Sequence, residues 1–502
     1  MERTDGMELE VFIPRGEKWE GEKAVHAQRL PDLNGKTIGE ISNRAWEADR
    51  VFPFVREMLR KIYPDIKFVP YTELPNESAN IADDETLGDI VAAKGCDAVI
   101  GGVAGGGGCA TAVGRALARI EKKGIPTFMI ARTGFKGIVQ NCFQSMGFLR
   151  DASMFEFPAD MFLPGKDFDR LEQNADKIVY GLTQWKPTAK ERKKRAEPKT
   201  MVIEGRDYDD ALDKMNALFL QNNWGDGLPF IPPTHDRVNW VLTGTDLPRD
   251  TAIGRILPSG RNATVEALAV HLAMTGGRPE YMPVMIAITR AMLDPRFRLH
   301  MMQATTCSSS IAAIVHGPIS KQIRMNPEYG CLGPHPGYPA GGRIGRAIHL
   351  MLQDIGEAYP GTVCMANFGG PQKWANVFFA EDEDGVPEGW TTLGEDRGFE
   401  KGVNAVTIHA IASSTNITSL DAGDEQSCYE TLLYYARMLN GDYGNILTNY
   451  SEESSPGIIV MPRGIANGIA RAGWSKEAVK QFLWENSKYQ WSVVSTDSHL
   501  LK

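Results

Sequence analysis

The chain has 502 residues, of which 42% are hydrophobic and 23% charged, a composition typical of a globular protein long enough for two or three domains. A formal net charge of −9 and the lack of a basic face argue against a nucleic-acid-binding surface, and no run of about 18 apolar residues indicates a membrane span. Seven cysteines without paired spacing, and an N-terminus (MERTDGMELEVF) without an apolar signal core, predict a cytoplasmic protein with free thiols.

The first part of the chain alternates apolar strand patterns with amphipathic helix patterns. The expected order of strand, helix, strand and helix falls on Gly35–Ser42, Ala48–Ile62, Ile66–Val69 and Asp84–Lys94. Such alternation predicts a parallel sheet with helices on both faces, which is an α/β fold. Asn43 follows the first strand, where it could either face a ligand or cap the next helix.

The next stretch predicts a strand, a glycine loop, a helix and a second strand. The apolar run Asp97–Val103 is followed by four glycines, Gly105–Gly108, and then by a helix pattern over Ala112–Lys122 and a strand over Ile125–Ile130. The loop contains one thiol, Cys109, at the start of the helix. This βαβ unit is the part of the chain around which we expect the function to be organised.

A thiol at a helix N-terminus is biased towards thiolate, because the unpaired N–H groups there carry partial positive charge. The glycines allow a carboxylate or phosphate to approach the backbone closely. The alternative is an inert small residue behind a tight turn. No phosphate-loop lysine follows the glycines, which excludes a Walker motif, and Cys109 and Thr111 break the spacing of a dinucleotide fingerprint, so no cofactor is expected. We expect Cys109 to be the catalytic nucleophile or base, with the substrate held by Gly106, Gly107, Gly108, Thr111 and Asn43.

This stretch resembles the UGSC-motif (seleno)protein family, in which a strand leads into U/C-G-S-C-T, a helix, and then IPT or IPV. Blocks in the second half, DGLPFIPPT, PEYMPVMIA, QATTCSSSIAAIVHGPI and GRIGRAIHLML, are similar to those of multidomain members, so the resemblance extends over most of the chain. The unit is also similar in topology to aspartate/glutamate racemase-type domains and to glycine-reductase substrate subunits. The resemblance implies a racemase-like N-terminal domain.

The sequence departs from the family at one position in the motif. When Cys109 is aligned with the final cysteine, Gly106 stands where the family has selenocysteine or cysteine. A redox cycle within the motif is therefore impossible, and one thiol remains for covalent or acid–base chemistry. Racemase-like enzymes place a second cysteine opposite the first, which makes Cys142 a candidate partner, although its amphipathic surroundings favour a core position.

A polar segment bounded by prolines, Lys186–Thr200, is the clearest boundary in the chain. Its short basic run is typical of a solvated linker. We therefore expect an N-terminal α/β domain over residues 1–185, a basic linker over 186–200, and a larger C-terminal α/β or α+β region over 201–502.

The second region contains a hydroxyl-rich turn that could contact the substrate. QATTCSSSIAAIVHGP includes the candidate binding residues Thr305, Thr306 and Ser308 and the candidate catalytic residues Cys307 and His316. The turn could instead be a set of helix caps. Arg343, at the start of a predicted helix, is a plausible anchor for an anionic group. No His, Cys, Asp or Glu set has metal-ligand spacing, so no metal is expected.

These features predict a cysteine-dependent enzyme acting on a small, carboxylated metabolite, through lyase or hydrolase chemistry or by proton abstraction next to a carbonyl. A thiol redox enzyme, an oxidoreductase like the selenoprotein homologues, is the first alternative. A non-catalytic anion-binding protein is the second. The expected partner is the small-molecule substrate, with no nucleic acid and no membrane, and the sequence leaves open whether the chain is a monomer or a homo-oligomer.

Overall fold

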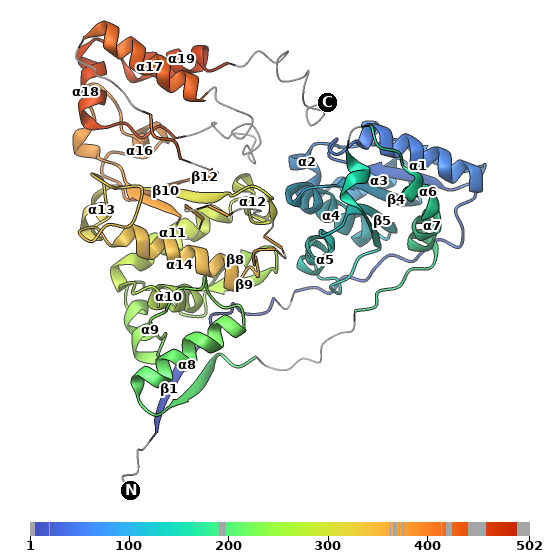
Figure 1. Cartoon of the computed structure of the whole chain (residues 1–502), viewed down its shortest axis with the longest axis horizontal. Helices are drawn as coiled ribbons and strands as arrows, with labels where there is room; N and C mark the ends of the chain where they lie inside the picture. Colours follow the sequence, from blue (N-terminus) through green and yellow to red (C-terminus); the bar gives the residue numbers. More distant parts are fainter. Residues whose placement is uncertain are drawn as a thin grey trace.

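The computed structural model describes residues 6–19, 21–163, 165–189, 197–361, 363–364, 369–370, 372–373, 376–412, 414–417, 424–439 and 458–488, without the side chains of 78–80. Two lobes are visible in Figure 1, and the first is built on the expected α/β unit. The core of this lobe is a five-stranded sheet in the order β3-β2-β4-β5-β6, with every neighbouring pair parallel. The expected α/β class is confirmed.

The strands of the first lobe are β2 (Thr37–Ile41), β3 (Lys67–Val69), β4 (Ala98–Ala104), β5 (Thr127–Arg132) and β6 (Met154–Phe157). Its helices are α1 (Ala48–Ile62), α2 (Ser78–Asp83), α3 (Leu87–Ala93), α4 (Gly107–Lys122), α5 (Lys136–Ser145), α6 (Asp169–Gln173) and α7 (Ala175–Thr183). Helices α3, α4 and α5 share an apolar core on one face of the sheet, and α1, α6 and α7 share one on the other.

Two helices differ from the sequence-based expectation. The segment expected as one helix over Asp84–Lys94 is split into α2 and α3, because the Asp84 side chain accepts hydrogen bonds from the N–H and hydroxyl of Thr86 and forms a turn between them. Helix α4 begins at Gly107, five positions before the expected start, since the glycines lack side chains that would block a helical turn there. Cys109 thus lies within the first turn of α4.

The strand order creates a topological switch point. After β2 the chain runs outward to β3 and then returns to β4 on the other side of β2. The loops that follow β2 and β4 therefore diverge from neighbouring strand ends, and open α/β sheets bind ligands at such a point. The loop after β2 contains Asn43, and the loop after β4 contains the four glycines.

The second lobe is a mixed α/β region around a three-stranded sheet in the order β11-β10-β12. Strand β10 (Ser310–His316) pairs parallel with β11 (Val377–Ala380) and antiparallel with β12 (Ala405–Ile411). The α-helices of this lobe are α8 (Tyr208–Gln221), α9 (His235–Leu242), α10 (Val265–Met274), α11 (Met282–Met292), α12 (Leu299–Ala304), α13 (Pro318–Gln322), α14 (Ala340–Asp354), α16 (Leu393–Asp396), α17 (Glu425–Leu439), α18 (Arg463–Arg471) and α19 (Lys476–Asn486). It also contains the strands β8 (Ala252–Ile256) and β9 (Arg261–Thr264) and the short 3-10 helices η3 (Pro279–Tyr281), η4 (Pro295–Phe297) and η5 (Glu383–Gly385). Two further 3-10 helices, η1 (Tyr71–Glu73) and η2 (Ala159–Phe162), belong to the first lobe.

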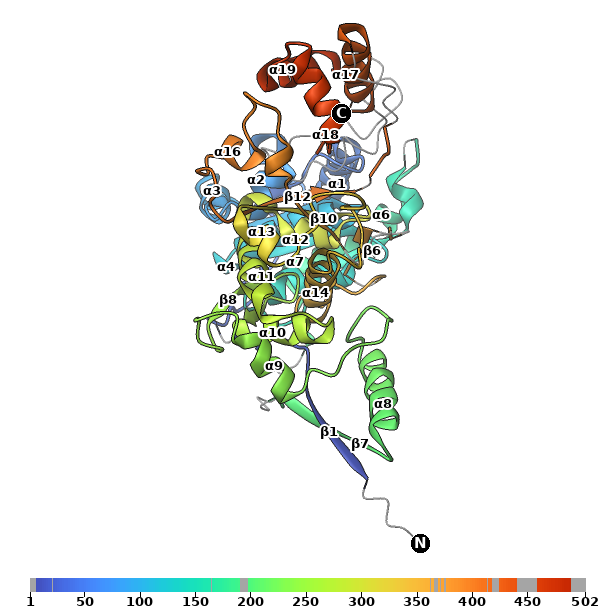
Figure 2. The same ribbon diagram turned by 90° about the vertical axis from the view of Figure 1, so that its left-hand side faces the viewer.

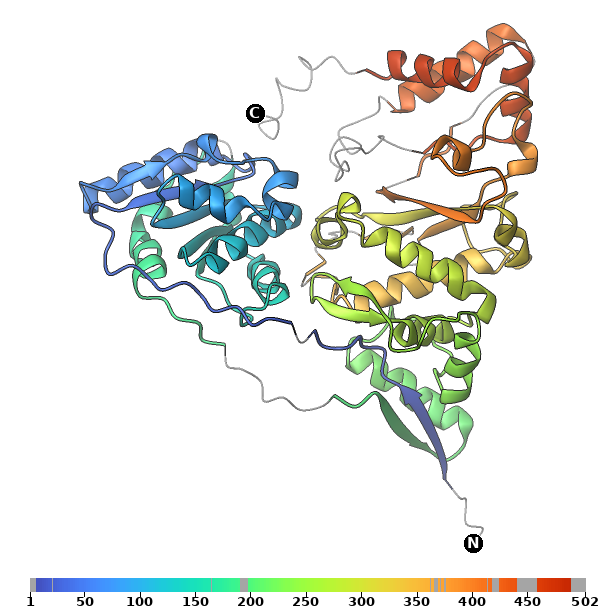
Figure 3. The ribbon, with the colours of Figure 1, turned by 180° about the vertical axis from the view of Figure 1, so that it is seen from behind.

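The start of the chain belongs to the second lobe and not to the first. Strand β1 (Met7–Phe12) pairs antiparallel with β7 (Thr200–Gly205), and α8 covers the pair, as Figure 2 shows. Leu9 and Val11 are buried in the core of the second lobe. The expected first domain of residues 1–185 is corrected accordingly, because β1 belongs to the second lobe and the elements of the first lobe all lie between β1 and β7 in the sequence. Figure 3 shows the connection that leaves β1 for the first lobe. Residues 190–196 of the expected linker lie outside the described residues.

The two lobes contact each other through α12 and α4. Ala304 and Val363 of the second lobe are buried in the same apolar core as the inner face of α4. Among the described residues, no helix has the length and hydropathy needed to cross a bilayer.

A buried carboxylate holds the lead-in segment of the first lobe against α4. Glu121 is 1% exposed and accepts hydrogen bonds from the N–H of Ala27 at 2.7 Å, from Arg29 at 2.7 Å and from the N–H of Thr127 at 2.9 Å. Burial raises the pKa of Glu121, but interactions with His26 and Arg29 and the backbone donors outweigh it and hold the pKa below its usual value. The charged form is therefore the one that stabilises the fold.

We expect Glu121→Gln to lower the free energy of unfolding by about 3 kcal/mol, because it leaves Arg29 buried without its charge partner. Since the pKa of Glu121 is lowered in the folded state, its contribution is present above the unfolded pKa of about 4.3 and is lost as the pH falls. Urea titration of both proteins between pH 7 and pH 4 measures this, and the difference between them should shrink at the acid end. The control is Glu172→Gln, an exposed ion pair with Lys61, which should change stability by less than about 0.5 kcal/mol.

Candidate functional site

The candidate site is formed where the loops after β2 and β4 meet. Cys109 hydrogen-bonds with the side chains of Asn43 and Trp46, both from the loop after β2. A Cβ on Gly105 would overlap the Trp46 indole ring, so the close packing of this ring on the loop requires a glycine. The sequence analysis brought Asn43 and Cys109 together and missed Trp46, whose signal was only its position four residues after a strand end.

The electrostatics of Cys109 differ from the expectation. Burial raises the pKa of the Cys109 thiol, while the hydrogen bonds with Asn43, Trp46 and the backbone lower it without reversing the change. The expectation that the helix N-terminus biases Cys109 towards thiolate is therefore corrected. Burial disfavours the charged thiolate by more than these hydrogen-bond donors stabilise it. Cys109 is a thiol at rest, surrounded by groups that stabilise its thiolate.

Arg132 is a second residue that the sequence analysis missed. It ends β5, next to β4, and its Nη1 donates to the Gly105 carbonyl oxygen at 3.2 Å. Its Nε is buried and has no hydrogen-bond partner in the described part of the chain. A guanidinium with a free donor at the carboxyl end of the sheet can bind an anionic group beside the glycine loop. An arginine after an apolar strand (PTFMIAR) was the available signal.

The second lobe closes the other side of the glycine loop. A Cβ on Gly107 would overlap the Ala304 carbonyl oxygen and would lie 3.2 Å from the Cα of Thr305. The hydroxyl of Thr305 accepts from the N–H of Cys307 at 3.1 Å, which fixes the turn that follows α12. The first residue of the expected turn of Thr305, Thr306 and Cys307 therefore contacts Gly107, at the start of α4 just before Cys109.

The loop after β2 is conformationally strained. Arg44, Trp46 and Glu47 have φ values of 62°, 61° and 62°, in the left-handed region that side chains other than glycine disfavour. Strain of this kind persists where the surrounding structure imposes it, often at ligand sites. Here it accompanies the packing of Trp46 on the glycine loop.

Four other candidates have structural partners. Thr111 is 4% exposed, and its hydroxyl donates to the Gly107 carbonyl oxygen within α4. Cys142 is buried in α5 against Gly114 of α4, and burial raises its pKa to about 12, so its position favours packing. Arg343 donates to the Gly276 carbonyl oxygen at 2.9 Å, at the end of α10, and Ser308 donates to the carbonyl of Gly369.

His316 lies at the far end of β10 from the hydroxyl-rich turn. Strand β10 has seven residues, Ser310–His316, and therefore spans about 20 Å. The structure does not bring His316 to the turn that touches the glycine loop.

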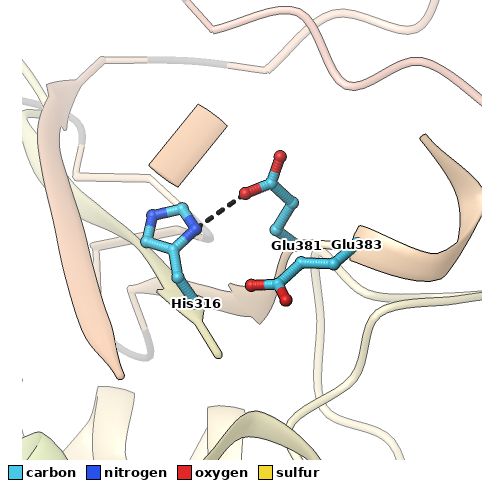
Figure 4. A group of neighbouring side chains, drawn as sticks. All are labelled: His316, Glu381 and Glu383. Carbon is cyan, nitrogen blue, oxygen red and sulfur yellow. Dashed lines mark hydrogen bonds and ion pairs between the residues drawn. The ribbon is translucent and has the colours of Figure 1, made fainter. Parts of the chain in front are cut away.

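His316 instead belongs to a separate polar group, shown in Figure 4. Its Nδ1 lies 2.8 Å from Glu381 Oε2, its Nε2 lies 2.9 Å from the Thr407 hydroxyl, and Glu383 completes a set whose ligand atoms lie within 4.8 Å of one another. This spacing suits a cation and was not evident in the sequence. Each side chain already has a protein partner, however, and Glu381 also accepts from the N–H of Leu393 at the start of α16. The group fixes α16 on the sheet.

We expect Gly107→Ala to separate the lobes locally, because its methyl group would overlap Ala304. Thermal unfolding should show a loss of about 1–3 kcal/mol, and hydrogen exchange should accelerate in α12. Gly106→Ala is the matched control, since a Cβ there would meet Trp46 at an ordinary 3.6 Å. If hydrogen exchange in α12 is equally fast in Gly107→Ala and Gly106→Ala, the contact between Gly107 and Ala304 is contradicted.

The pH midpoint of Cys109 alkylation tests the hydrogen bonds to its sulfur. We expect a midpoint above the ordinary thiol value of about 8.5 in the wild type. Asn43→Ala should raise it by about one further pH unit, because it removes a donor to the thiolate. Peptide mass spectrometry after timed alkylation measures this, and the exposed Asn34→Ala serves as control. A wild-type midpoint well below 8.5 would overturn this electrostatic description.

Comparison with known proteins gives one match. Residues 10–184 match the model of the UGSC family, a range that begins within β1 and ends one residue after α7. The similar blocks noted in the second half of the sequence lie outside this match. No curated protein and no solved structure matches the chain. Over residues 10–184, the chain carries a UGSC family domain.

Proposed function

We propose that the protein is a cysteine-dependent enzyme that acts on a small carboxylated metabolite, with Cys109 as the nucleophile or base of a lyase-type, hydrolase-type or proton-abstraction reaction. The observation that carries the proposal is the position of Cys109 in the first turn of α4, at a topological switch point, with Asn43 and Trp46 on its sulfur. All seven cysteines are free thiols, which fits the reducing conditions of the cytoplasm.

The substrate carboxylate would bind beside the glycine loop. Arg132 offers its unpaired Nε there, and the backbone N–H groups at the start of α4 favour negative charge. A carbonyl next to that carboxylate would then lie near Cys109, and the same N–H groups would stabilise negative charge developing on its oxygen.

The raised pKa of Cys109 restricts how the thiol would act. A thiol that is protonated at rest gives up its proton only when a bound substrate or an incoming base makes the thiolate favourable. Asn43 and Trp46 would stabilise that thiolate by donating to it. This arrangement suits a residue that becomes reactive after the substrate has entered.

Two alkylating reagents of similar size test the carboxylate preference. Iodoacetate carries a carboxylate and iodoacetamide does not, so an ordinary thiolate reacts more slowly with iodoacetate because of charge repulsion. We expect Cys109 to show the opposite order, with saturation by iodoacetate and a preference of about tenfold. Arg132→Met should abolish that preference while leaving the reaction with iodoacetamide intact.

Lys136→Met is the matched control, because it removes an exposed positive charge four residues from Arg132. Cys331 provides an internal reference thiol in every sample. A panel of small carboxylic acids, tested for protection of Cys109 from iodoacetamide, then narrows the substrate class. If Cys109 prefers iodoacetamide as Cys331 does, the carboxylate site is wrong.

A thiol redox enzyme is the second candidate, favoured by one contact. Thr305 packs on Gly107, and Cys307 follows two residues later, so the two lobes bring a second thiol to the same interface. Oxidation of Cys109 and Cys307 to a disulfide would release two protons and pass two electrons to an acceptor. Diamide treatment followed by peptide mapping tests this, and a Cys109–Cys307 disulfide that dithiothreitol reverses would favour it over the first proposal.

A further inference from the structure

A small cavity, lined by both apolar and polar side chains, lies inside the second lobe behind the hydroxyl-rich turn. It has a volume of about 30 Å³ and lies between the end of α12, the start of β10 and α14. Its lining includes Ser309, His349, Gln353, Cys364 and Lys373. None of these residues belongs to the group around Cys109, so the cavity is separate from the proposed reaction.

One buried hydroxyl in this cavity has no partner. Ser309 is 2% exposed, and its Oγ makes no hydrogen bond to the described part of the protein. A buried hydroxyl without a partner costs about 1–3 kcal/mol relative to a satisfied one. Since the hydroxyl lines an open space, a bound group in that space would supply the missing hydrogen bond.

The cavity also contains one positive charge. The Lys373 ammonium donates to the Ser309 carbonyl oxygen at 3.0 Å, and no carboxylate among the described residues forms an ion pair with it. Burial lowers the pKa of His349 to about 4, with Lys373 and Arg346 adding to the effect against the opposing charge of Asp226. The imidazole is therefore neutral near pH 7, and the lining carries a net positive charge from Lys373.

The size of the space limits what it can hold. One water-sized group needs about 10–15 Å³ by the same measure, so the cavity has room for two. Two oxygen atoms held next to an ammonium and a hydroxyl are the recognition pattern of a carboxylate. Two ordered waters would fill the same volume, but they would leave the lysine without a counter-charge.

We propose that this cavity is a binding site for the carboxylate of a small monocarboxylic acid, held by the Lys373 ammonium and the Ser309 hydroxyl. The ligand's remaining atoms would extend through the open side of the cavity. The site is independent of Cys109 and would exist even if the proposed enzymatic function were wrong.

Saturation-transfer NMR on the full chain, with formate and acetate as probes, tests the proposal at pH 7. We expect both anions to bind saturably to the wild type, and we expect no saturable binding of the neutral analogues formamide and acetamide. Ser309→Ala should weaken acetate binding by about 10- to 100-fold, since it removes one hydrogen bond to a charged group. Lys373→Met should weaken it at least as much.

Two controls separate the site from general effects. Ser320→Ala removes another buried hydroxyl of this lobe, and Lys321→Met removes an exposed charge, and neither lines the cavity. Both should bind acetate as the wild type does. Ser309→Ala removes a hydroxyl that has no partner, so thermal unfolding should confirm that this variant is folded. Three results would each overturn the proposal: equal binding of acetate and acetamide, acetate binding by Ser309→Ala that equals that of the wild type, or no saturable binding of acetate. The last result is expected if the cavity holds two ordered waters.

Discussion

The candidate site depends on one close approach between backbones, the packing of Gly107 against Ala304. Because Gly107 has no side chain, the first turn of α4 can touch the turn that follows α12, and the same contact buries Ala304 and Val363 in the core of the first lobe. The N-terminus of α4 is thus enclosed by two different parts of the chain. Trp46 covers the glycine loop from within the first lobe, and Thr305 covers it from the second.

This enclosure explains why Cys109 is not simply an activated thiolate. Partial charges at a helix start favour an anion, but Cys109 is partly buried, and the surrounding protein removes much of the water that would solvate its thiolate. Burial is the larger effect, so the pKa is raised even though Asn43 and Trp46 both interact with the sulfur. The opposing contributions leave a thiol whose protonation state is sensitive to any change in its surroundings, including the arrival of a negatively charged or polar ligand.

The sequence predicted what local periodicity can reveal. The strand before Cys109 was expected within one residue of its observed position, the start of the helix was expected five residues too late, and the alternation of elements was enough to predict a parallel sheet. Trp46 and Arg132 were missed because their relevance follows from the strand order, which places the ends of β2 and β5 on either side of β4. The sign of the pKa shift at Cys109 was also beyond local analysis, since burial of the sulfur depends on residues distant in sequence.

Other features that the sequence analysis did not show also depend on long-range pairing. The hydrogen bond from Arg343, the expected anion anchor, to the Gly276 carbonyl oxygen depends on how α10 lies against α14, which no local pattern shows. The spacing of His316, Glu381 and Glu383 appears only when β10 and β11 lie side by side. Strand β1 was placed in the first domain by its order along the chain, although its partner, β7, is nearly two hundred residues away, with Phe12 opposite Thr200.

The pairing of β1 with β7 makes the first lobe an insertion within the second. Phe12 and Thr200 are opposite each other in the antiparallel pair, so the chain leaves the second lobe and re-enters it at points about 5 Å apart. Two tethers, and not one, therefore hold the inserted lobe near α12, which keeps its effective concentration at the contact high even if the contact itself is weak. In evolutionary terms, such an architecture allows a thiol-bearing module to be added to a pre-existing fold without disturbing that fold's own sheet.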